Sequence, residues 1–264
     1  MTRAFNNPEW HDAIAGLIRA RDDQATAVAL AKVVDVAVDN DATCLLAFYR
    51  DAPPSVLHHT MTPRRARHYL DRYLAGPYLL DPLYQLAVRK NKPAMCRCRD
   101  ETPDRFRSSE YFRQYYERTH LADEMDFLLD TDTKSTLVLI VGRWETRFSR
   151  SDVARLRLME PIVRAAMQRI WDAWAARHSA DERDLSMHQR LTHCFRHFGE
   201  KALTQRERQI TQLLLRGHSS KSIARELGIA PGTVMVHKRN LFSKLGISSQ
   251  YELFSLFIDR LSAL

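Results

Sequence analysis

The sequence lacks the long apolar runs of a membrane protein. Among its 264 residues, apolar runs such as Leu137 to Val141 are far shorter than the roughly 20 residues needed to cross a bilayer. The N-terminal stretch, MTRAFNNPEWHDA, has no apolar segment of the kind found in secretion signals. Four cysteines are too few for a disulfide scaffold, which is typical of a reducing compartment. We therefore predict a cytoplasmic protein with no membrane partner.

Motifs that would mark a catalytic site are also lacking. The chain has eight glycines, yet none belongs to a phosphate-binding loop, and there is no GxSxG nucleophile turn. Cys96 and Cys98, like His58 and His59, have metal-binding side chains, but no second spaced pair completes a tetrahedral site. The sequence therefore predicts a protein that is not an enzyme and holds no metal or other cofactor.

What the chain does have is an apolar content of 45% and an uneven charge. The apolar content suffices for at least one proper core. The net charge is +8, which favours nucleic acid or an anionic surface as a partner. Residues 1 to 178 hold 27 basic and 24 acidic side chains, whereas residues 203 to 264 hold 9 and 4. The positive excess therefore lies mainly in the last quarter of the chain.

The hydrophobic pattern before residue 178 alternates between helical and strand-like periods. Ser149 is a good N-cap for a helix of about 28 residues, because apolar side chains follow it at steps of three and four. Two strands at 125–131 and 135–143 are expected at the centre of an antiparallel sheet. This order of elements predicts an α+β chain with an N-terminal α-β-α sandwich. The other expected elements are helices at 24–38, 63–74 and 82–90 and a hairpin of strands at 42–49 and 55–60.

The C-terminal quarter carries helix start and stop signals in close succession. Thr204 and Glu207 form a capping-box pattern ahead of a first helix, which Gly217 ends. A second helix begins at Ser219 or Ser220 and a third at Pro231. Two helices joined by a short turn that contains glycine are typical of a helix-turn-helix, so we expect an all-α bundle here.

The third of these helices has a buried stripe and an outward face. Val234, Leu241 and Leu245 recur at steps of seven and four, so the outward residues are Met235, Val236, Arg239 and Ser243. Arginine can bond a guanine edge in a DNA major groove, and apolar side chains can touch a thymine methyl. Four flanking lysine and arginine residues are expected at phosphates: Lys221, Arg225, Lys238 and Lys244. A fourth helix, at 248–261, is expected to pack or dimerise rather than to read DNA.

The segments LTQRERQITQLLLRG, SSKSIARELGI and TVMVHKRNLFSKLGI, within residues 203 to 254, resemble the LuxR-type, or GerE-like, helix-turn-helix. This resemblance implies a transcription factor that binds double-stranded DNA as a homodimer, with its third helix in the major groove. It places base reading on Met235, Val236 and Arg239, and Thr233 and Lys238 near phosphate.

Two positions depart from the family pattern. The family usually has lysine where Met235 stands, and serine or threonine where Ala230 stands. One cationic contact and one helix cap are therefore missing. We expect an operator preference that differs from that of relatives with the lysine.

The N-terminal region does not match a phosphorylated receiver domain, because Asp22 and Asp23 follow a helical segment rather than a first strand. Four residues resemble the autoinducer-binding domain of LuxR-type quorum-sensing regulators instead: Tyr69, Tyr73, Tyr78 and Asp81. In that family the aspartate accepts a hydrogen bond from the ligand amide. The resemblance implies a sensor fold of PAS or GAF character and a small-molecule effector, either an acyl-homoserine lactone or another metabolite.

Read from the residues alone, the same cluster leaves two alternatives. Tyrosines around one carboxylate provide the apolar walls and polar groups of a ligand pocket. Alternatively, the tyrosines are half-buried core residues and Asp81 caps the helix that begins at Pro82.

We predict a ligand-responsive transcriptional regulator with a sensing and dimerisation domain at 1–178, a helical linker at 179–202 and a DNA-binding domain at 203–264. The linker and the long helix before it would transmit the effector signal. RNA polymerase is a candidate partner. The first alternative is a ligand-independent regulator whose N-terminal domain serves only dimerisation or protein interaction, and the second is an enzyme with a DNA-binding tail. The effector, the operator and the direction of regulation are open.

Overall fold

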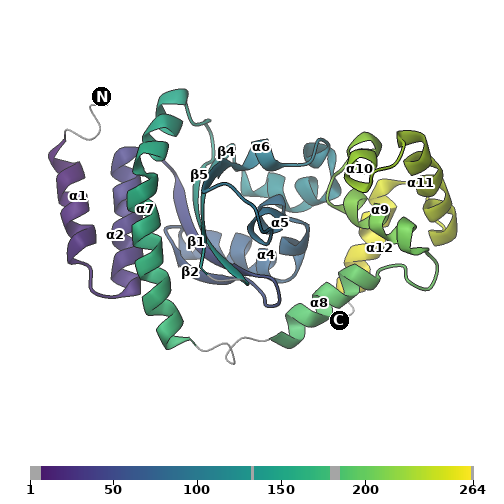
Figure 1. Ribbon diagram of the computed structural model, residues 1–264, viewed down its shortest axis with the longest axis horizontal. Coiled ribbons are helices and arrows are strands. Elements are labelled where there is room, and N and C mark those ends of the chain that lie inside the picture. Colours follow the sequence, from purple (N-terminus) through teal and green to yellow (C-terminus); the bar gives the residue numbers. More distant parts are fainter. Residues whose placement is uncertain (1–6, 132–133, 179–184, 263–264) are drawn as a thin grey trace. The chain divides into compact units, whose positions relative to one another are not determined.

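The computed structural model of the chain describes residues 7–131, 134–178 and 185–262. The chain forms two compact units, and each unit is made of several segments that alternate along the sequence (Figure 1). Among the described residues, no helix is both long and apolar enough to span a membrane. The first unit comprises the described residues within 1–71, 86–101 and 120–184. The second unit comprises the described residues within 72–85, 102–119 and 185–264.

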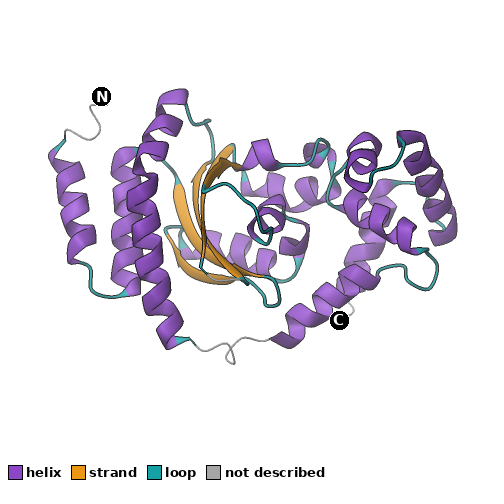
Figure 2. Cartoon of the chain, viewed as in Figure 1, coloured by secondary structure: helices purple, strands orange, loops and turns teal. Residues whose placement is uncertain are grey.

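The first unit is built on a five-stranded antiparallel sheet (Figure 2). Its central strand, β5 (Ser135–Arg143), pairs with β1 (Ala42–Tyr49) on one side and with β4 (Asp123–Asp130) on the other. The edges are β2 (Ser55–His59) and β3 (Met95–Arg97). The predicted antiparallel sheet, with the strands near 125–131 and 135–143 at its centre, is confirmed.

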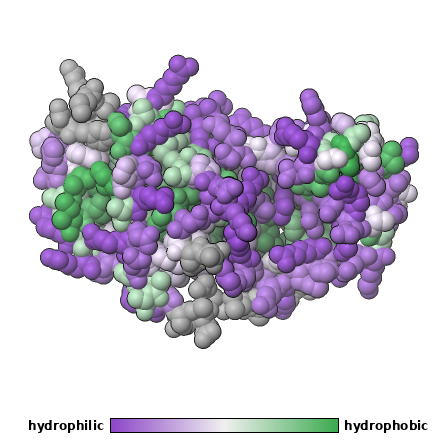
Figure 3. Space-filling model, viewed as in Figure 1, coloured by the Kyte–Doolittle hydropathy of each residue, from purple (hydrophilic) through white to green (hydrophobic). Residues whose placement is uncertain are grey.

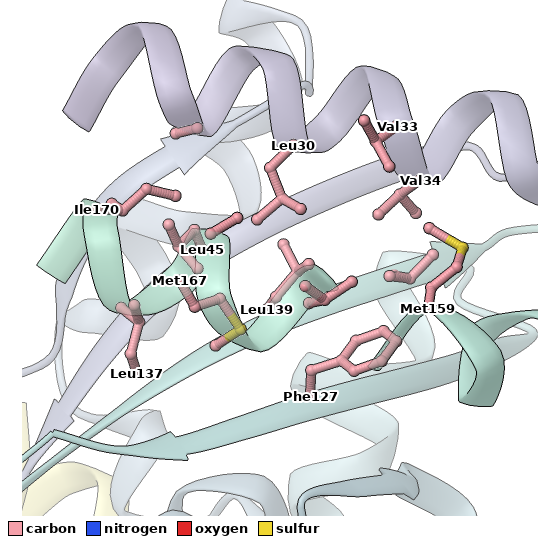
Figure 4. Close-up of a cluster of buried hydrophobic side chains, with 14 of the residues drawn as sticks. Leu30, Val33, Val34, Leu45, Phe127, Leu137, Leu139, Met159, Met167 and Ile170 are labelled. Carbon is pink, nitrogen blue, oxygen red and sulfur yellow. The ribbon is translucent and has the colours of Figure 1, made fainter. Parts of the chain in front are cut away.

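One face of this sheet is the floor of the main hydrophobic core. Because strand side chains alternate between faces, every second residue of β1, β4 and β5 points to the same layer of helices. That layer consists of α2 (Asp23–Ala37) and α7 (Arg150–Arg177), and α1 (Pro8–Arg19) packs against α2. Figure 4 shows Leu45 and Leu139 of the sheet packed with residues of α2 and α7. Each buried leucine of this kind contributes about 1.5–3 kcal/mol relative to an exposed one.

The start of α7 is tied to the end of β5. Ser149 and Asp152 form a reciprocal capping box, as the sequence pattern indicates. Asp152 also accepts hydrogen bonds from Arg143, at 3.0 Å, and from Arg155. Burial alone would raise the pKa of Asp152, but the bonds from Ser149 and the two arginines lower it below the usual range. The helix has 28 residues, which confirms its predicted length.

Two helical segments differ from their predicted form. Residues 63–74 are expected to form one helix, but they divide into α3 (Pro63–Ala66), a π-helical turn η2 (Arg67–Asp71) and α4 (Arg72–Leu74). The helix from Pro82 was expected to reach about residue 90, yet α5 (Pro82–Ala87) ends earlier. At the end of α5, the Thr136 hydroxyl donates a hydrogen bond of 2.8 Å to the Ala87 carbonyl oxygen. This bond satisfies a carbonyl that has no partner within the helix.

The second unit contains the helix-turn-helix bundle. Its helices are α8 (Leu185–His197), α9 (Gln205–Leu215), α10 (Ser220–Leu227), α11 (Pro231–Leu245) and α12 (Gln250–Ser262). The capping box at the start of α9 is present as predicted. Phe195 of α8 contacts the Phe257 ring of α12 edge-on, so α12 uses part of its apolar face for packing within this unit. The α+β fold class is confirmed.

Candidate functional site

Helix α11 presents two unlike faces. Val234 and Leu241 are fully buried in the bundle. On the outward side, Met235 is 64% exposed and Val236 is 47% exposed, and Arg239 is exposed as well. Figure 3 shows hydrophobic side chains emerging over this part of the bundle within an otherwise hydrophilic surface. Exposed apolar residues beside an arginine are suited to contacts with base edges and thymine methyl groups in a major groove.

The ends of α11 follow from its sequence. Pro231 occupies the first turn, but Ala230 offers no side chain to cap the free backbone N–H groups. Gly246 ends the helix with φ of 67°, a left-handed conformation that favours glycine. The missing cap matches the departure at position 230 noted in the sequence.

The four flanking cations are in different surroundings. Lys221 and Arg225 lie exposed on α10. Lys238 is half-buried, with its ammonium 5.3 Å from the centre of the Phe242 ring. Burial, followed by the positive charge of Arg105, lowers the pKa of Lys238.

Lys244 is engaged within the bundle. Its ammonium lies 2.8 and 3.0 Å from the two carboxylate oxygens of Glu207, the residue that caps α9. Burial would raise the pKa of Glu207, but Lys244 and Thr204 hold it below the usual range. The expected phosphate contact of Lys244 therefore competes with an ion pair that stabilises the bundle.

Three of the four residues expected at the ligand site lie together. The Tyr73 hydroxyl donates a hydrogen bond of 2.6 Å to the Asp81 carboxylate, whose other oxygen accepts from the Leu83 N–H at 3.0 Å. Asp81 is buried, and burial raises its pKa to about 6 against the opposing effect of those two bonds. The rings of Tyr73 and Tyr78 are 6.1 Å apart. Because its carboxylate accepts the hydrogen bond from the Leu83 N–H, Asp81 also caps the start of α5, as the second alternative from the sequence predicts.

Tyr78 extends this cluster to the linker helix. Its side chain is fully buried in the short 3-10 helix η3 (Pro77–Leu80), and its hydroxyl lies 2.7 Å from Nδ1 of His188 in α8. The other ring nitrogen of His188 lies 3.2 Å from the Thr192 hydroxyl. The fourth expected residue, Tyr69, is half-buried in η2 of the first unit, where its ring contacts His68 edge-on.

Known proteins that resemble this chain show which family it belongs to. Residues 201–257 match the family described as bacterial regulatory proteins, luxR family. A putative HTH-type transcriptional regulator of Aeromonas salmonicida is 34% identical over 157 residues, which cover 58% of this chain and 80% of that protein. The chain belongs to the luxR family. It is a DNA-binding transcriptional regulator of this family.

Two further proteins match parts of this LuxR-family protein. The transcriptional regulatory protein UhpA of Escherichia coli is 49% identical over 57 residues, or 22% of this chain and 29% of UhpA. The solved LBD domain of VqsR from Pseudomonas aeruginosa aligns with a TM-score of 0.56 and 27% identity, and the alignment covers 62% of this chain and 97% of that domain.

The segment that contains Asp104 and Arg105 contacts the helix-turn-helix of this LuxR-family protein. Asp104 accepts a hydrogen bond of 2.9 Å from the Ser219 N–H and another from the Ser219 hydroxyl. The Arg105 N–H donates to the Gly217 carbonyl at 3.1 Å. A Cβ at Gly217 would lie 3.0 Å from Phe106, so the close approach and the φ of 88° both favour glycine. These contacts hold the residues just ahead of α10.

Sequence reasoning missed His188, Asp104 and Ser219 as contact residues. Tyr78 and His188 are separated by 110 positions, and Asp104 and Ser219 by 115. No local spacing pattern signals pairs of this kind.

Proposed function

We propose that this LuxR-family regulator binds its operator as a homodimer and that a small molecule bound near Tyr73, Tyr78 and Asp81 sets its affinity for DNA. The observation that carries the proposal is the hydrogen bond between Tyr78 and His188. It joins the candidate effector residues to α8, which packs on α12 of the DNA-binding bundle. A ligand that moves Tyr78 therefore acts on the bundle through this buried contact.

The DNA-binding side of the proposal rests on α11. Met235, Val236 and Arg239 read base edges, because they are exposed on one face of the helix. Thr233, Lys238, Lys221 and Arg225 contact phosphates and set the register, with Lys244 shared between phosphate and Glu207. In a dimer, two such helices lie one turn of DNA apart, about 34 Å, so the operator is an inverted repeat.

The effector has the character of a molecule with a hydrogen-bonding amide or amine and an apolar part. Asp81 provides the acceptor, and the tyrosine rings provide apolar walls. An acyl-homoserine lactone has these features, and the likeness to the LBD domain of VqsR supports a ligand-binding role. Domains at 1–178 and 203–264 joined by a linker at 179–202 remain our prediction, although the compact units group residues 72–85 and 102–119 with the bundle.

A specific observation favours the ligand-independent alternative. Asp81 already accepts bonds from the Tyr73 hydroxyl and the Leu83 N–H, which is the arrangement of a structural cap. In that case the N-terminal region serves only dimerisation, and no small molecule changes operator affinity.

Two assays on the same protein distinguish ligand-responsive regulation from ligand-independent regulation. The operator is first selected from a library of random DNA duplexes, and the full chain is then screened for thermal stabilisation by acyl-homoserine lactones of different chain length. A ligand present at 100 times its Kd should stabilise the protein by about 2.7 kcal/mol. The same ligand should change operator affinity. Absence of both effects across the lactones and a wider metabolite panel would support the alternative.

The Tyr78–His188 contact is tested by His188→Ala. We expect this variant to bind the effector as the wild type does but to lose the change in operator affinity. His193→Ala, which alters an α8 histidine whose ring stacks on His197, is the matched control. A full effector response in His188→Ala would remove this contact from the signalling route.

A further inference from the structure

The face of the sheet opposite the main core gathers four metal-ligating side chains. The ladder between β3 and β4 places Cys96 opposite Asp126 and Arg97 opposite Met125. Cys98, the first residue of α6 (Cys98–Glu101), follows the last paired residue of β3 and lies close to Glu124. Because side chains two residues apart share a face, the two thiols and the two carboxylates form a four-cornered group. All four residues are buried, and Asp126 has no exposed surface.

The donor atoms of this group are close together. The Cys98 sulfur and one carboxylate oxygen from each of Glu124 and Asp126 all lie within 4.8 Å of one another. The Cys96 sulfur lies 3.9 Å from Oδ2 of Asp126. Ligands around a tetrahedral zinc ion are about 3.5 Å apart, given zinc–sulfur and zinc–oxygen distances of about 2.3 and 2.0 Å. Shifts of roughly 1 Å, within the reach of ordinary side-chain rotation, would therefore close the site.

The group places two carboxylates beside two thiols, away from solvent. Glu124 and Asp126 are buried, as are Cys96 and Cys98. A divalent ion would bind the carboxylates directly and displace the thiol protons.

A neighbouring carboxylate shows the contrasting arrangement. Asp123 lies one residue before Glu124 and so points to the other face of β4. There it forms an ion pair with the Arg97 guanidinium and accepts a hydrogen bond of 2.8 Å from the Phe148 N–H. The strand therefore pairs an acid with an arginine on one face and groups acids with thiols on the other.

We propose that Cys96, Cys98, Glu124 and Asp126 form a binding site for a divalent metal ion of the zinc class. Two thiolates and two carboxylates match the preference of Zn²⁺ for four tetrahedral sulfur, nitrogen and oxygen ligands. Binding of the divalent ion releases the two thiol protons, so the overall charge of the group does not change. The site ties the edge strand β3 to β4. It does not rest on the effector or the operator, so it stands or falls separately from the proposed function.

The first test is a zinc titration of the full chain after removal of metal with a chelator. We expect one Zn²⁺ per chain in the wild type and a loss of affinity of more than about 100-fold in Cys98→Ser and Asp126→Asn. Cys194→Ser removes a buried thiol in the second unit, and Asp130→Asn removes a carboxylate at the far end of β4. Both controls should bind zinc as the wild type does. No binding by the wild type, or unchanged binding by Cys98→Ser and Asp126→Asn, would overturn the proposal.

The second test reports on the ligands of the metal first in the wild-type protein and then in two double variants. Co²⁺ added to the metal-free wild type should give a thiolate-to-cobalt charge-transfer band in the near ultraviolet and intense visible bands of a tetrahedral complex. Cys96→Ser/Cys98→Ser should lose the charge-transfer band, whereas Cys44→Ser/Cys194→Ser should keep it. A wild-type spectrum without the charge-transfer band, or a band that persists in Cys96→Ser/Cys98→Ser, would exclude thiolate ligation here.

Discussion

The outward face of α11 and the cluster around Asp81 lie in the same compact unit but differ in how their side chains are satisfied. On α11, Met235 and Val236 expose apolar surface and Arg239 exposes its charge. In the cluster, Asp81 and Tyr78 are buried and hydrogen-bonded to other residues of the protein. The first surface has binding groups ready for a partner, whereas the second has its polar groups already in use.

This difference implies two kinds of binding. In the proposed function, DNA docks on the α11 surface without rearranging its core, because Val234 and Leu241 on the other side remain packed. An effector bound as we propose would replace bonds within the cluster, such as the one between Tyr73 and Asp81. Such binding would change contacts inside the protein, as regulation by a ligand requires.

The largest change in stability is expected from a substitution on the buried side of α11. Leu241→Ala removes a fully buried side chain and should lower the free energy of unfolding by about 2–5 kcal/mol. Met235→Ala, on the exposed side, should change it by less than about 0.5 kcal/mol and weaken operator binding instead. Urea unfolding of both variants measures the contrast. Equal destabilisation by the two substitutions would mean that Met235 is part of the core.

Within the exposed face, arginine and lysine should act differently. Arg239→Ala should weaken operator binding by about 1–3 kcal/mol and leave binding to scrambled DNA much less affected, because it removes a base contact. Lys238→Ala should weaken binding to both DNAs about equally and reduce the salt dependence, because it removes a phosphate contact. Titrations at several salt concentrations distinguish these effects. Equal losses on both sequences for Arg239→Ala would contradict base reading.

The buried cluster should respond to pH. The folded pKa of Asp81, about 6, is above the ordinary value of 3.8, so the folded state keeps a proton that the unfolded chain releases. The stability linked to this proton is full below about pH 4 and is lost as the pH rises to about 6. Between pH 5 and 7.5, the wild type should lose about 1 kcal/mol relative to Asp81→Asn. Urea unfolding of both proteins at the two pH values measures this, and parallel losses would contradict the raised pKa.

Local patterns predicted much of this molecule. Capping residues such as Thr204 and Ser149 mark helix starts because their bonds reach only three residues along the chain. The strands of the central sheet were predicted because they contain short apolar runs, and nearly all of their residues are buried. The outward face of α11 followed from the spacing of Val234 and Leu241 in the same way.

Features that depend on distant partners were not predicted. Strand β3 has three residues, too few for a period, and it is recognisable only by its pairing with β4. The ion pair between Lys244 and Glu207, and the bond between Tyr78 and His188, join residues 37 and 110 positions apart. The candidate metal site was not predicted for the same reason. The sequence places Cys96 and Cys98 close together, but only the pairing of β3 with β4 brings Glu124 and Asp126 to them. Packing, rather than local preference, decides such contacts.

The central claim is that the exposed face of α11 selects the DNA sequence, and Met235 tests it most directly. Wild type, Met235→Lys and Lys221→Ala are each used to select binding sites from the same random duplex library. We predict that Met235→Lys changes the preferred base at one or two positions in each half-site, because lysine can bond a guanine edge that methionine cannot. Lys221→Ala should select the wild-type sequence with lower affinity. Identical selected sites from the wild type and Met235→Lys would contradict base reading by α11.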